Sequence, residues 1–476
     1  MALVSTYIED LLEGSEGSYK LVNPHTKEEV ATIPECSNSQ MERAIQEAES
    51  VTDELASMSL AERSEILIKV AGIIEEEKER FASTIVKESA KPIKYARGEV
   101  DRTIETLKFC AVEARKLEGE SIRLDAAPNG QGRDAYTIYE PLGVIGAITP
   151  FNFPLNLVVH KVGPAIAAGN TIVVKPAEKT PLSSFLLKEA FEKAGLPSKA
   201  LAVVTGDGPR LGKVLIDHPD VKKITFTGSP EVGETIKSQV GLKKLTLELG
   251  NNSALYIDRT EEENLSEIAG KVATGAFSYS GQVCISTQRV YVHNQISEKF
   301  ITELVQATSK LQYGDPFDEG TDIASLIDES SQARLLDWIE DATKNGAEIL
   351  CGGKCFGYGL EPTIMQGVDA SDKLSSREVF GPIVNVNVVN DSEEALEEMN
   401  DSRYGLNAGV FTSDIKTGLR MAHALDVGQV LVNDIPTLRF DHMPYGGRKD
   451  SGYGYEGVKY AIKEMTKMKM ISLNYT

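Results

Sequence analysis

The spacing of apolar residues predicts a helical N-terminal part followed by a switch to strands. Over residues 41–57, 59–88 and 94–118, apolar positions recur every three to four residues, as in amphipathic helices. The second of these segments opens with Ser-Leu-Ala-Glu, a capping box that marks a helix start. The segment from Ser121 to Tyr139 then changes to strand-like runs around Ala-Ala-Pro-Asn-Gly-Gln-Gly, which predicts a β-hairpin.

From Gly143 to Glu248, short β-rich apolar runs alternate with helical segments. The predicted strands are Val144–Thr149, Thr171–Lys175, Leu201–Thr205, Lys223–Thr227 and Leu245–Leu249, and the helices lie near 156–169, 182–195, 208–217 and 230–239. This alternation predicts an α/β fold with a parallel, doubly wound sheet that binds ligands beyond the carboxyl ends of its strands. A second α/β alternation runs from about Asn264 to Val432, and a last strand is expected at Thr466–Asn474.

Composition narrows the class of protein. The chain has 476 residues, which suggests two or three domains. Its 41% hydrophobic and 25% charged residues are typical of soluble globular proteins. The net charge of −21 argues against nucleic acid or an anionic membrane surface as a partner. The longest apolar stretch, Pro141 to Val174, is interrupted by prolines and polar residues and does not predict a membrane span.

Cysteine usage and the N-terminal segment both favour a cytoplasmic protein. The five cysteines are scattered and odd in number, which is typical of a reducing compartment. The first ten residues show neither the basic region nor the apolar core of a signal peptide. Cys351 and Cys355 resemble half of a zinc site, but no second ligand pair follows, so no metal is predicted.

Two glycine-rich turns follow predicted strands and are candidate phosphate-binding loops. Gly206–Gly212 is close to the G-x-G-x-x-G pattern but has one extra residue before its last glycine. In the second turn, Ser229 suits a helix N-cap and Pro230 the first helical position, and the amides of such a helix start favour a phosphate. Ordinary βα turns explain both motifs equally well.

Several other residues fit both a chemical role and an ordinary structural one. Cys284 is either a small buried hydrophobe or a nucleophile. Glu248 is expected at the end of a strand, where it is either a residue on a solvated face or a general base. Asn152 is either a turn residue or an oxyanion donor, and Lys175 with Glu178 forms either a solvated turn or a ribose contact.

The ordered set of these segments carries more information than any one of them. The segments are Thr149–Pro154, Val174–Glu178, Phe226–Ser229, Leu247–Gly250, Gly281–Cys284, Glu378–Pro382 and Pro444–Gly447. Their order and spacing resemble the NAD(P)-dependent aldehyde dehydrogenase superfamily over essentially the whole chain. The segments around Cys284 and Tyr445 most resemble the lactaldehyde, phosphonoacetaldehyde and non-phosphorylating glyceraldehyde-3-phosphate dehydrogenase branch.

The resemblance implies three structural parts and an oligomer. A Rossmann-type NAD-binding domain is expected at residues 1–121 and 142–247, and an α/β catalytic domain at residues 248–460. Residues 122–141 and 461–476 would form a β-arm that bridges subunits of a homodimer or homotetramer.

The resemblance also implies a mechanism. Cys284 matches the nucleophile, which forms a thiohemiacetal and then a thioester with the aldehyde. Asn152 and the Cys284 amide would hold the oxyanion, and Glu248 would activate the water that hydrolyses the thioester. The alternatives are a CoA-acylating aldehyde dehydrogenase, against which Glu248 argues, and a catalytically inactive structural protein on the same scaffold.

Matching positions imply where the cofactor binds. The cofactor-binding positions are Lys175, Glu178, Ser229, Gly228, Phe151, Glu378 and Phe380. Glu178 would accept hydrogen bonds from both adenosine-ribose hydroxyls and repel a 2′-phosphate, so NAD is expected, with NADP as the alternative. By the same resemblance, the Ser229 helix would meet the pyrophosphate, and the Gly206–Gly212 loop would have no part in binding.

The substrate positions implied by the resemblance suggest a polar tunnel. They are Phe153, Asn156, Leu157, His160, Val283, Ile285, Arg439 and Tyr445. Because Arg439 suits bidentate capture of an anion, we expect a small hydroxylated or anionic aldehyde. The alternative is that Arg439 pairs with Asp441 or another acid and never meets substrate. Asn251 replaces a glycine common in the family, for which we expect only a small backbone adjustment.

Overall fold

The computed structural model describes residues 2–475, and its N-terminal part is helical as predicted. The elements are α1 (Ala2–Leu12), the hairpin β1 (Gly17–Val22) and β2 (Glu29–Glu35), α2 (Asn38–Glu49), α3 (Thr52–Ser57), α4 (Leu60–Glu76), α5 (Lys78–Ser89) and α6 (Ile93–Ala114). The capping box is confirmed, because Ser59 and Glu62 each accept the other's backbone amide. The helices predicted at 41–57 and 59–88 are each divided in two, the second at Glu77, whose φ of −99° and ψ of 21° leave helical geometry.

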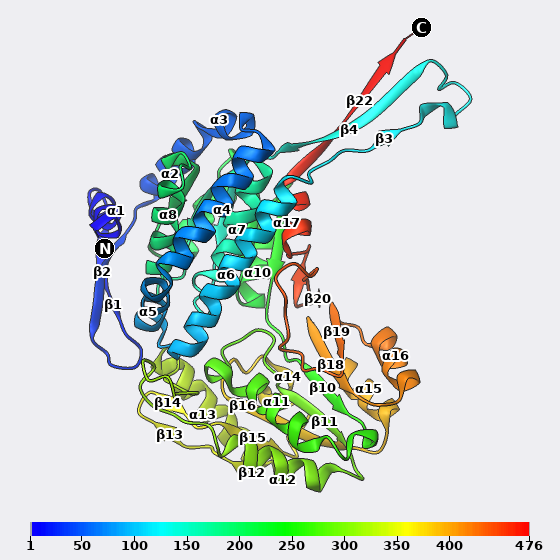
Figure 1. Cartoon of the computed structure of the whole chain (residues 1–476). Coiled ribbons are helices and arrows are strands. Elements are labelled where there is room, and N and C mark those ends of the chain that lie inside the picture. The colour runs from blue at the N-terminus through cyan, green and yellow to red at the C-terminus, as the bar shows by residue number, and fades with distance from the viewer. Residues whose placement is uncertain (1, 476) are drawn as a thin grey trace.

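A six-stranded sheet follows, in the order β21-β9-β8-β5-β6-β7. Its parallel strands are β5 (Val144–Ile148), β6 (Thr171–Lys175), β7 (Leu201–Val203), β8 (Val221–Thr227) and β9 (Lys244–Glu248), with β21 (Gly452–Tyr453) as an antiparallel edge. The helices between them are α7 (Asn156–Ala168), α8 (Leu182–Lys193), α9 (Gly208–Asp217) and α10 (Pro230–Gln239). Helices α4 to α8, drawn in blue to green in the upper part of Figure 1, pack on one face, and α2, α9 and α10 cover the other. The predicted doubly wound sheet is therefore confirmed.

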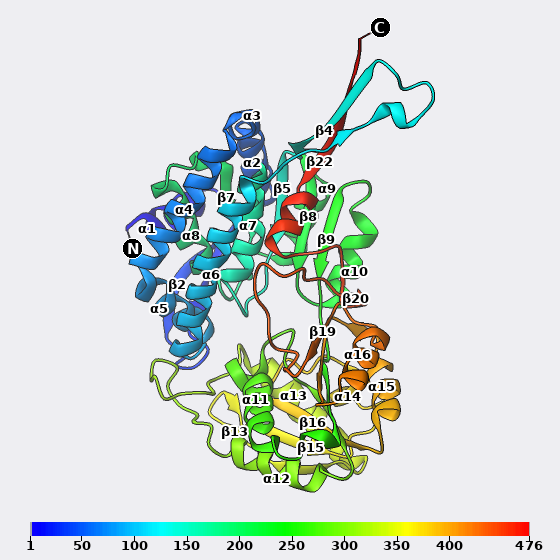
Figure 2. The same cartoon turned by 45° about the vertical axis from the view of Figure 1, so that its right-hand side comes forward.

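The second α/β part contains a seven-stranded sheet, seen below the first in Figure 2. Its strands, in spatial order, are β12 (Glu348–Cys351), β15 (Thr363–Gln366), β16 (Ile383–Val389), β11 (Arg289–His293), β10 (Ala254–Ile257), β18 (Asn407–Phe411) and β19 (Gln429–Val432). All pairs are parallel except the one made by β12. On one face lie α11 (Leu265–Phe277) and α12 (Ser297–Thr308). On the other lie α13 (Glu329–Lys344), α14 (Lys373–Ser376), α15 (Ser392–Asn400) and α16 (Ile415–Ala424).

Short elements complete the chain. The two-residue strands are β13 (Cys355–Phe356), β14 (Gly359–Leu360), β17 (Tyr404–Gly405) and β20 (Arg448–Lys449), and the 3-10 turns are Leu124–Ala126, Ser198–Ala200, Arg259–Glu261 and Ser278–Gly281. Among the described residues, no helix is both long and apolar enough to cross a membrane. The domain boundaries stay a prediction, although β21 shows that the C-terminal region returns to complete the first sheet.

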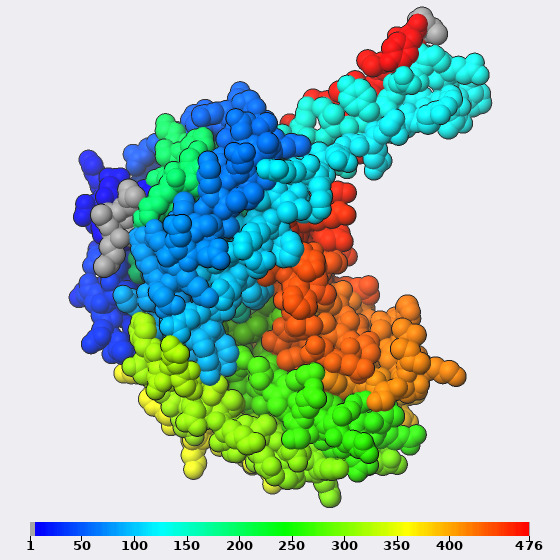
Figure 3. Space-filling view, viewed as in Figure 1, coloured from blue at the N-terminus to red at the C-terminus, as the bar shows by residue number. Residues whose placement is uncertain are grey.

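A three-stranded arm projects from the body of the molecule (Figures 1 and 3). It consists of β3 (Ser121–Ile122), β4 (Arg133–Pro141) and β22 (Thr466–Asn474), and α17 (Val458–Glu464) precedes its last strand. The hairpin predicted from the sequence forms only a short ladder, because β3 pairs with β4 at Ser121 and Ile122 alone. The main partner of β4 is β22, which runs antiparallel to it over its full length.

Candidate active site

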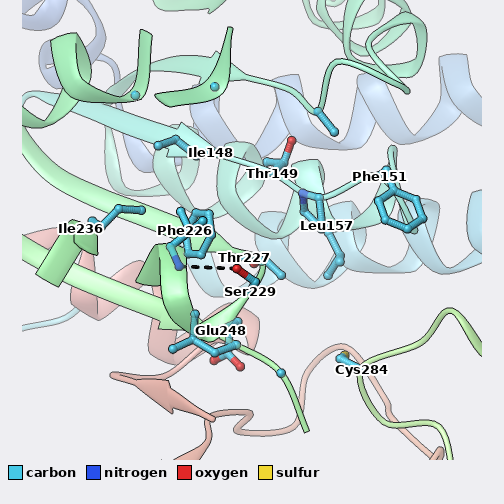
Figure 4. Close-up of a pocket in the computed structure, with 18 of the residues that line it drawn as sticks. Ile148, Thr149, Phe151, Leu157, Phe226, Thr227, Ser229, Ile236, Glu248 and Cys284 are labelled. Carbon is cyan, nitrogen blue, oxygen red and sulfur yellow. Dashed lines mark hydrogen bonds between the residues drawn. The ribbon is translucent and has the colours of Figure 1, made fainter. Parts of the chain in front are cut away.

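A cavity of about 740 Å³ lies at the carboxyl ends of β5, β6, β8 and β9 and extends to loops of the second α/β part (Figure 4). It is lined by every residue predicted to act in catalysis or to bind cofactor: Cys284, Glu248, Asn152, Lys175, Glu178, Ser229, Gly228, Phe151, Glu378 and Phe380. This volume is in the usual range for ligand sites. The fold therefore brings these residues from several distant segments to one place.

The starts of α9 and α10 form one end of the cavity. Ser229 caps α10 by accepting the Val232 amide at 3.4 Å (Figure 4). Gly208 and Gly212 of α9 line the same cavity, so the structure does not support the expectation that the Gly206–Gly212 loop has no part in the site. A Cβ at position 208 would lie 3.0 Å from the Glu178 carboxylate, and glycine therefore permits this close approach.

The predicted ribose contacts Lys175 and Glu178 form an ion pair beside α9. Lys175 ends β6 and its side chain is buried, whereas the Glu178 side chain is about half exposed. Tyr19 donates a 2.9 Å hydrogen bond to the Glu178 backbone carbonyl, which fixes this turn. A carboxylate and an ammonium at this edge suit the hydroxyls of a ribose.

Glu378 forms the opposite side of the cavity. Its carboxylate accepts the Asn251 backbone amide at 3.1 Å, and burial raises the pKa of Glu378 to about 8. A Cβ at Gly250 would come within 2.7 Å of the same carboxylate. Asn251, which stands where many family members have glycine, does not need a left-handed backbone, because its φ is not positive. Its side chain donates a hydrogen bond to the Ser253 hydroxyl.

Phe380 and Phe151 enclose this end of the cavity. Their rings meet edge to face with centroids 5.7 Å apart. Phe380 has a φ of 49°, a left-handed conformation that is rare for a bulky residue. Such local strain is typical of functional sites, where the surrounding structure holds it.

The loop that carries Cys284 is also tightly constrained. Tyr279, Ser280 and Gly281 have consecutive positive φ values of 50°, 54° and 66°. A Cβ at Gly281 would lie 2.1 Å from the Gly381 carbonyl oxygen, so only glycine allows the two loops to touch. The Cys284 Sγ lies 3.3 Å from the Tyr445 hydroxyl oxygen. The thiol is therefore held at the cavity by a strained turn and a close polar neighbour.

The environment of Cys284 disfavours the thiolate in the absence of cofactor. Burial raises the pKa of the Cys284 thiol to about 11, although the Tyr445 hydroxyl and the Arg439 charge act in the opposite direction. Val283 and Ile285 lie with Cys284 in a small apolar cluster and do not line the cavity. Cys284 thus rests as a protonated thiol near neutral pH.

Asn152 is positioned beside the loop that carries Cys284. Its side chain is buried, and Nδ2 donates a 2.9 Å hydrogen bond to the backbone carbonyl of Gln282. A carboxamide nitrogen has two N–H donors, so this bond leaves one free. Asn152 can therefore donate to an oxyanion formed on a carbon attached to Cys284.

Glu248 ends β9 as a buried carboxylate whose oxygens have no hydrogen-bond partner among the described residues. Burial and the nearby charge of Glu456 raise its pKa well above the usual value. Glu456 itself is paired with Lys161 at 2.7 Å and Arg439 at 3.3 Å. Burial alone would raise the pKa of Glu456, but the charges of Lys161 and Arg439 lower it to about 2. The negative charge of Glu456 thus makes Glu248 a stronger base than an exposed carboxylate.

Asn156 and His160, predicted to line a polar substrate tunnel, lie outside this cavity. Both are fully buried on α7 and bind the Asp441 carboxylate, through His160 Nε2 at 2.8 Å and Asn156 Nδ2 at 3.3 Å. Asp441 also pairs with Arg102 at 2.6 Å. Asp441 binds one nitrogen of each side chain, whereas His160 Nδ1 has no hydrogen-bond partner among the described residues, so substrate contact by Asn156 and His160 stays a prediction.

Arg439 both pairs with an acid and lines the cavity, so it fits each of the two interpretations left open by the sequence, an ion pair and a contact with substrate. It pairs with an acid, but with Glu456 rather than Asp441. It also lines the cavity together with Leu157 and Tyr445, and its guanidinium lies 3.6 Å from the centre of the Tyr445 ring. Its Nε is buried and has no hydrogen-bond partner among the described residues. A buried guanidinium with a free donor beside Cys284 suits an anionic group.

Phe153, the remaining predicted substrate residue, does not line this cavity. Its ring is covered by the ammonium of Lys91 at 3.8 Å. Phe153 follows Asn152 directly, so its packing bears on the placement of the predicted oxyanion donor.

Comparison with known proteins decides the family. The model of the aldehyde dehydrogenase family matches residues 12–471. The chain belongs to the aldehyde dehydrogenase family. The predicted α/β fold, the enzyme class of NAD(P)-dependent oxidoreductases and a nicotinamide dinucleotide cofactor are thereby confirmed.

Relatives of this aldehyde dehydrogenase act on small polar aldehydes. It is 42% identical over 468 residues to 3-sulfolactaldehyde dehydrogenase of Priestia megaterium, covering 98% of this chain and 97% of the relative. It is 41% identical to lactaldehyde dehydrogenase of Methanococcus aeolicus, covering 95% and 96%.

Solved structures confirm the fold of this aldehyde dehydrogenase. Aldehyde dehydrogenase 21 of Physcomitrella patens, in complex with the reaction product succinate, superposes with a TM-score of 0.93 at 36% identity, covering 97% of this chain and 96% of that one. The glyceraldehyde-3-phosphate dehydrogenase GapN of Methanocaldococcus jannaschii, complexed with NADP, gives a TM-score of 0.92 at 36% identity, covering 96% and 99%.

Lys161 and Glu456, two of the charges that act on the pKa of Glu248 in this aldehyde dehydrogenase, were not singled out from the sequence. Lys161 was visible only as an interruption of an apolar stretch, and Glu456 follows a glycine-rich turn with no motif of its own. A lysine within an otherwise apolar helix was the one available signal, because a buried ammonium needs an acidic partner. That partner is 295 residues away in the sequence.

The raised thiol pKa predicts a steep pH dependence for alkylation of Cys284 in the cofactor-free enzyme. Below the pKa of about 11, the thiolate fraction rises roughly tenfold per pH unit. The iodoacetamide rate at the Cys284 peptide should therefore rise steadily between about pH 7 and about pH 10. A rate that levels off near neutral pH would show instead that the site lowers the pKa of this thiol.

Proposed function

We propose that this aldehyde dehydrogenase uses NAD to oxidise a small polar or anionic aldehyde, of lactaldehyde size, to the carboxylic acid. The observation that carries the proposal is the meeting of Cys284, Asn152 and Glu248 in one cavity with the buried Arg439. The dinucleotide-binding positions line the same cavity, so cofactor and aldehyde can meet at Cys284.

The first half-reaction forms a covalent bond between Cys284 and the aldehyde carbon. The Cys284 thiol gives up its proton to water, the thiolate attacks the carbonyl, whose electron pair moves to oxygen, and the free N–H of Asn152 and the Cys284 backbone amide hold that oxyanion. A nicotinamide dinucleotide bound in the cavity would accept a hydride from the thiohemiacetal carbon, and the loss of this hydride leaves a thioester. Asn152 stabilises charge only after attack, so it lowers the barrier rather than strengthening aldehyde binding.

The second half-reaction is hydrolysis with Glu248 as the general base. Its raised pKa suits removal of a proton from water as the water attacks the thioester carbon. The C–S bond then breaks, the Cys284 thiolate leaves, and the acid is released. The nearby Glu456 remains ionised through Lys161 and Arg439, which keeps Glu248 the stronger base of the two.

The cavity fits a dinucleotide, and we propose NAD as the physiological cofactor, with NADP as the alternative. The helix starts of α9 and α10 supply amides toward its pyrophosphate, and Lys175 and Glu178 line the cavity beside Gly208, where the adenosine ribose would bind. Glu178 accepts from ribose hydroxyls, whereas a 2′-phosphate there would meet its negative charge. The M. jannaschii GapN structure contains NADP, so the preference of this chain depends on its own Glu178.

Arg439 supports an anionic substrate, in line with relatives that act on sulfolactaldehyde and with the succinate complex of the P. patens enzyme. We expect kcat/KM for 3-sulfolactaldehyde or succinate semialdehyde to exceed that for hexanal. In Arg439→Met, kcat/KM for the anionic aldehyde should fall about 30-fold, which corresponds to about 2 kcal/mol for a lost charged hydrogen bond.

Lactaldehyde serves as the neutral control for this variant, because Arg439 also pairs with Glu456. Its kcat/KM should change much less than that of the anionic aldehyde. Equal losses for both aldehydes would mean that Arg439 acts only by supporting Glu456. A wild-type preference for hexanal would remove the proposal of a polar substrate.

We propose that the enzyme forms a homodimer or homotetramer through its arm and acts in the cytoplasm. The arm exposes Tyr136, Met468, Met470 and Leu473 on its projecting strands. Met468 and Met470 lie on one face of the arm and Tyr136 and Leu473 on the other, and exposed apolar side chains of this kind on a projecting sheet suit a partner subunit.

A further inference from the structure

A buried ion pair lies behind the loop that carries Asn152. Lys91 follows α5 and Glu99 lies on α6, and neither side chain has any exposed surface. Their charged groups bind each other directly. Two charges buried in this way cost more free energy to desolvate than an apolar pair of similar volume. The need to fill space in the core therefore does not explain why these two residues are charged.

The Glu99 carboxylate reaches the backbone that follows Asn152. One of its oxygens accepts the amides of Leu155 at 2.9 Å and Asn156 at 3.1 Å, while the other binds Lys91. These amides belong to the start of α7, where N–H groups lack partners within the helix. A negative charge also complements the dipole at this end. Glu99 thus anchors the chain three residues beyond Asn152.

The Lys91 ammonium contacts both loops of the proposed reaction centre. It lies 3.8 Å from the centre of the Phe153 ring and 4.5 Å from that of Tyr279. Phe153 is the neighbour of Asn152, and Tyr279 begins the strained turn that leads to Cys284. Cation–π attraction is strongest at desolvated sites such as this one. One charged group therefore joins the two loops from behind.

We propose that Lys91, held by Glu99, is a positioning residue that keeps the Asn152 amide in place over the aldehyde carbon at Cys284. The inference rests on the proposed function, because it requires Asn152 to stabilise the oxyanion. Asn152 also contacts the loop that carries Cys284, through its 2.9 Å hydrogen bond to the Gln282 carbonyl. A displacement of about 1 Å at such a group is enough to lower a rate about 100-fold.

The test removes both charges together in Lys91→Met/Glu99→Gln, so that no lone charge stays buried. The glutamine oxygen still accepts the α7 amides, which favours folding. We expect kcat to fall about 100-fold, the Kd for NAD to stay within about twofold, and the deuterium isotope effect on the aldehyde hydrogen to rise. If that variant does not fold, Lys91→Gln/Glu99→Gln replaces it, because it also leaves no lone charge buried and keeps a hydrogen-bonding group at both positions; it should lose roughly tenfold in kcat. Wild-type kcat in a folded variant would overturn the proposal.

The matched control is Lys78→Met, which removes a surface ion pair with Asp101 between the same two helices, α5 and α6. It should keep wild-type kcat and KM, because exposed pairs contribute little. A loss equal to that of the double variant would mean that any disturbance between these helices lowers the rate, and the proposal would be wrong.

Combination with Asn152→Ala separates positioning from a general structural effect. If the pair acts through Asn152, adding Lys91→Met/Glu99→Gln to Asn152→Ala lowers kcat no further than Asn152→Ala does alone. Additive losses would contradict the inference. If Asn152→Ala itself keeps wild-type kcat, the oxyanion role in the proposed function fails. If Asn152→Ala loses activity and the pair variant does not, only the present inference fails.

Discussion

Replacement of Cys284 by alanine is expected to lower kcat for aldehyde oxidation by at least about 10⁴-fold, the scale seen when a covalent nucleophile is removed. Without Sγ no thiohemiacetal forms, and the free N–H of Asn152 has no oxyanion to bind. The loss is measured as the rate of NADH formation with a panel of polar aldehydes. The Kd for NAD should stay nearly unchanged, because the side chains proposed to bind the dinucleotide lie on other segments.

The control for this variant is Cys355→Ala, which removes an exposed thiol of β13 in the second α/β part. It should retain wild-type kcat. Turnover that survives in Cys284→Ala would show that another group attacks the aldehyde. Loss of NAD binding in that variant would point to a structural role for the thiol instead.

Substitution of Glu248 by glutamine is expected to separate the two half-reactions. Hydride transfer does not need the general base, so the variant should release a burst of about one NADH per active site. Thioester hydrolysis should then slow by roughly 10³-fold, within the range for loss of a general base. The change is nearly isosteric, and the carboxylate has no hydrogen-bond partner among the described residues to lose. Rapid-mixing absorbance measurements give both the burst and the steady rate.

Absence of a burst would place Glu248 before hydride transfer and contradict its proposed role. Asn152→Ala provides the opposite control, since it should slow the first half-reaction by about 100-fold and show no burst. Adding CoA to the Glu248 variant distinguishes the CoA-acylating alternative. Formation of acyl-CoA at the wild-type rate would favour that alternative over hydrolysis.

The local elements of this fold were predictable because their signals lie within a few residues. The capping box at Ser59 and the Ser229–Pro230 helix start are both present in the structure. The break between α4 and α5 was not predictable, since the apolar spacing continues across Glu77 while the backbone leaves helical geometry there. The main partner of β4 was missed in the hairpin prediction because β22 lies more than 300 residues further along the chain.

In the candidate site too, features carried by local motifs were predictable from the sequence, and features set by distant residues were not. Ordered motifs predicted which side chains would line the cavity, and the structure places Cys284, Glu248 and Asn152 there together. The assignment of His160 to a substrate tunnel could not be checked from sequence, because its partner Asp441 is 281 residues away. The sequence around a polar residue on a helix does not indicate which distant group forms a hydrogen bond with its side chain.

If Cys284 carries the substrate as a thioester, that species can be trapped when its hydrolysis is slow. Glu248→Gln is mixed with NAD and 3-sulfolactaldehyde, quenched in acid during the slow phase, and analysed by intact mass and peptide mapping. We expect one sulfolactoyl group per chain, attached at Cys284 and absent when NAD is omitted. An unmodified chain after a full burst of NADH, or an acyl group on another residue, would contradict this expectation.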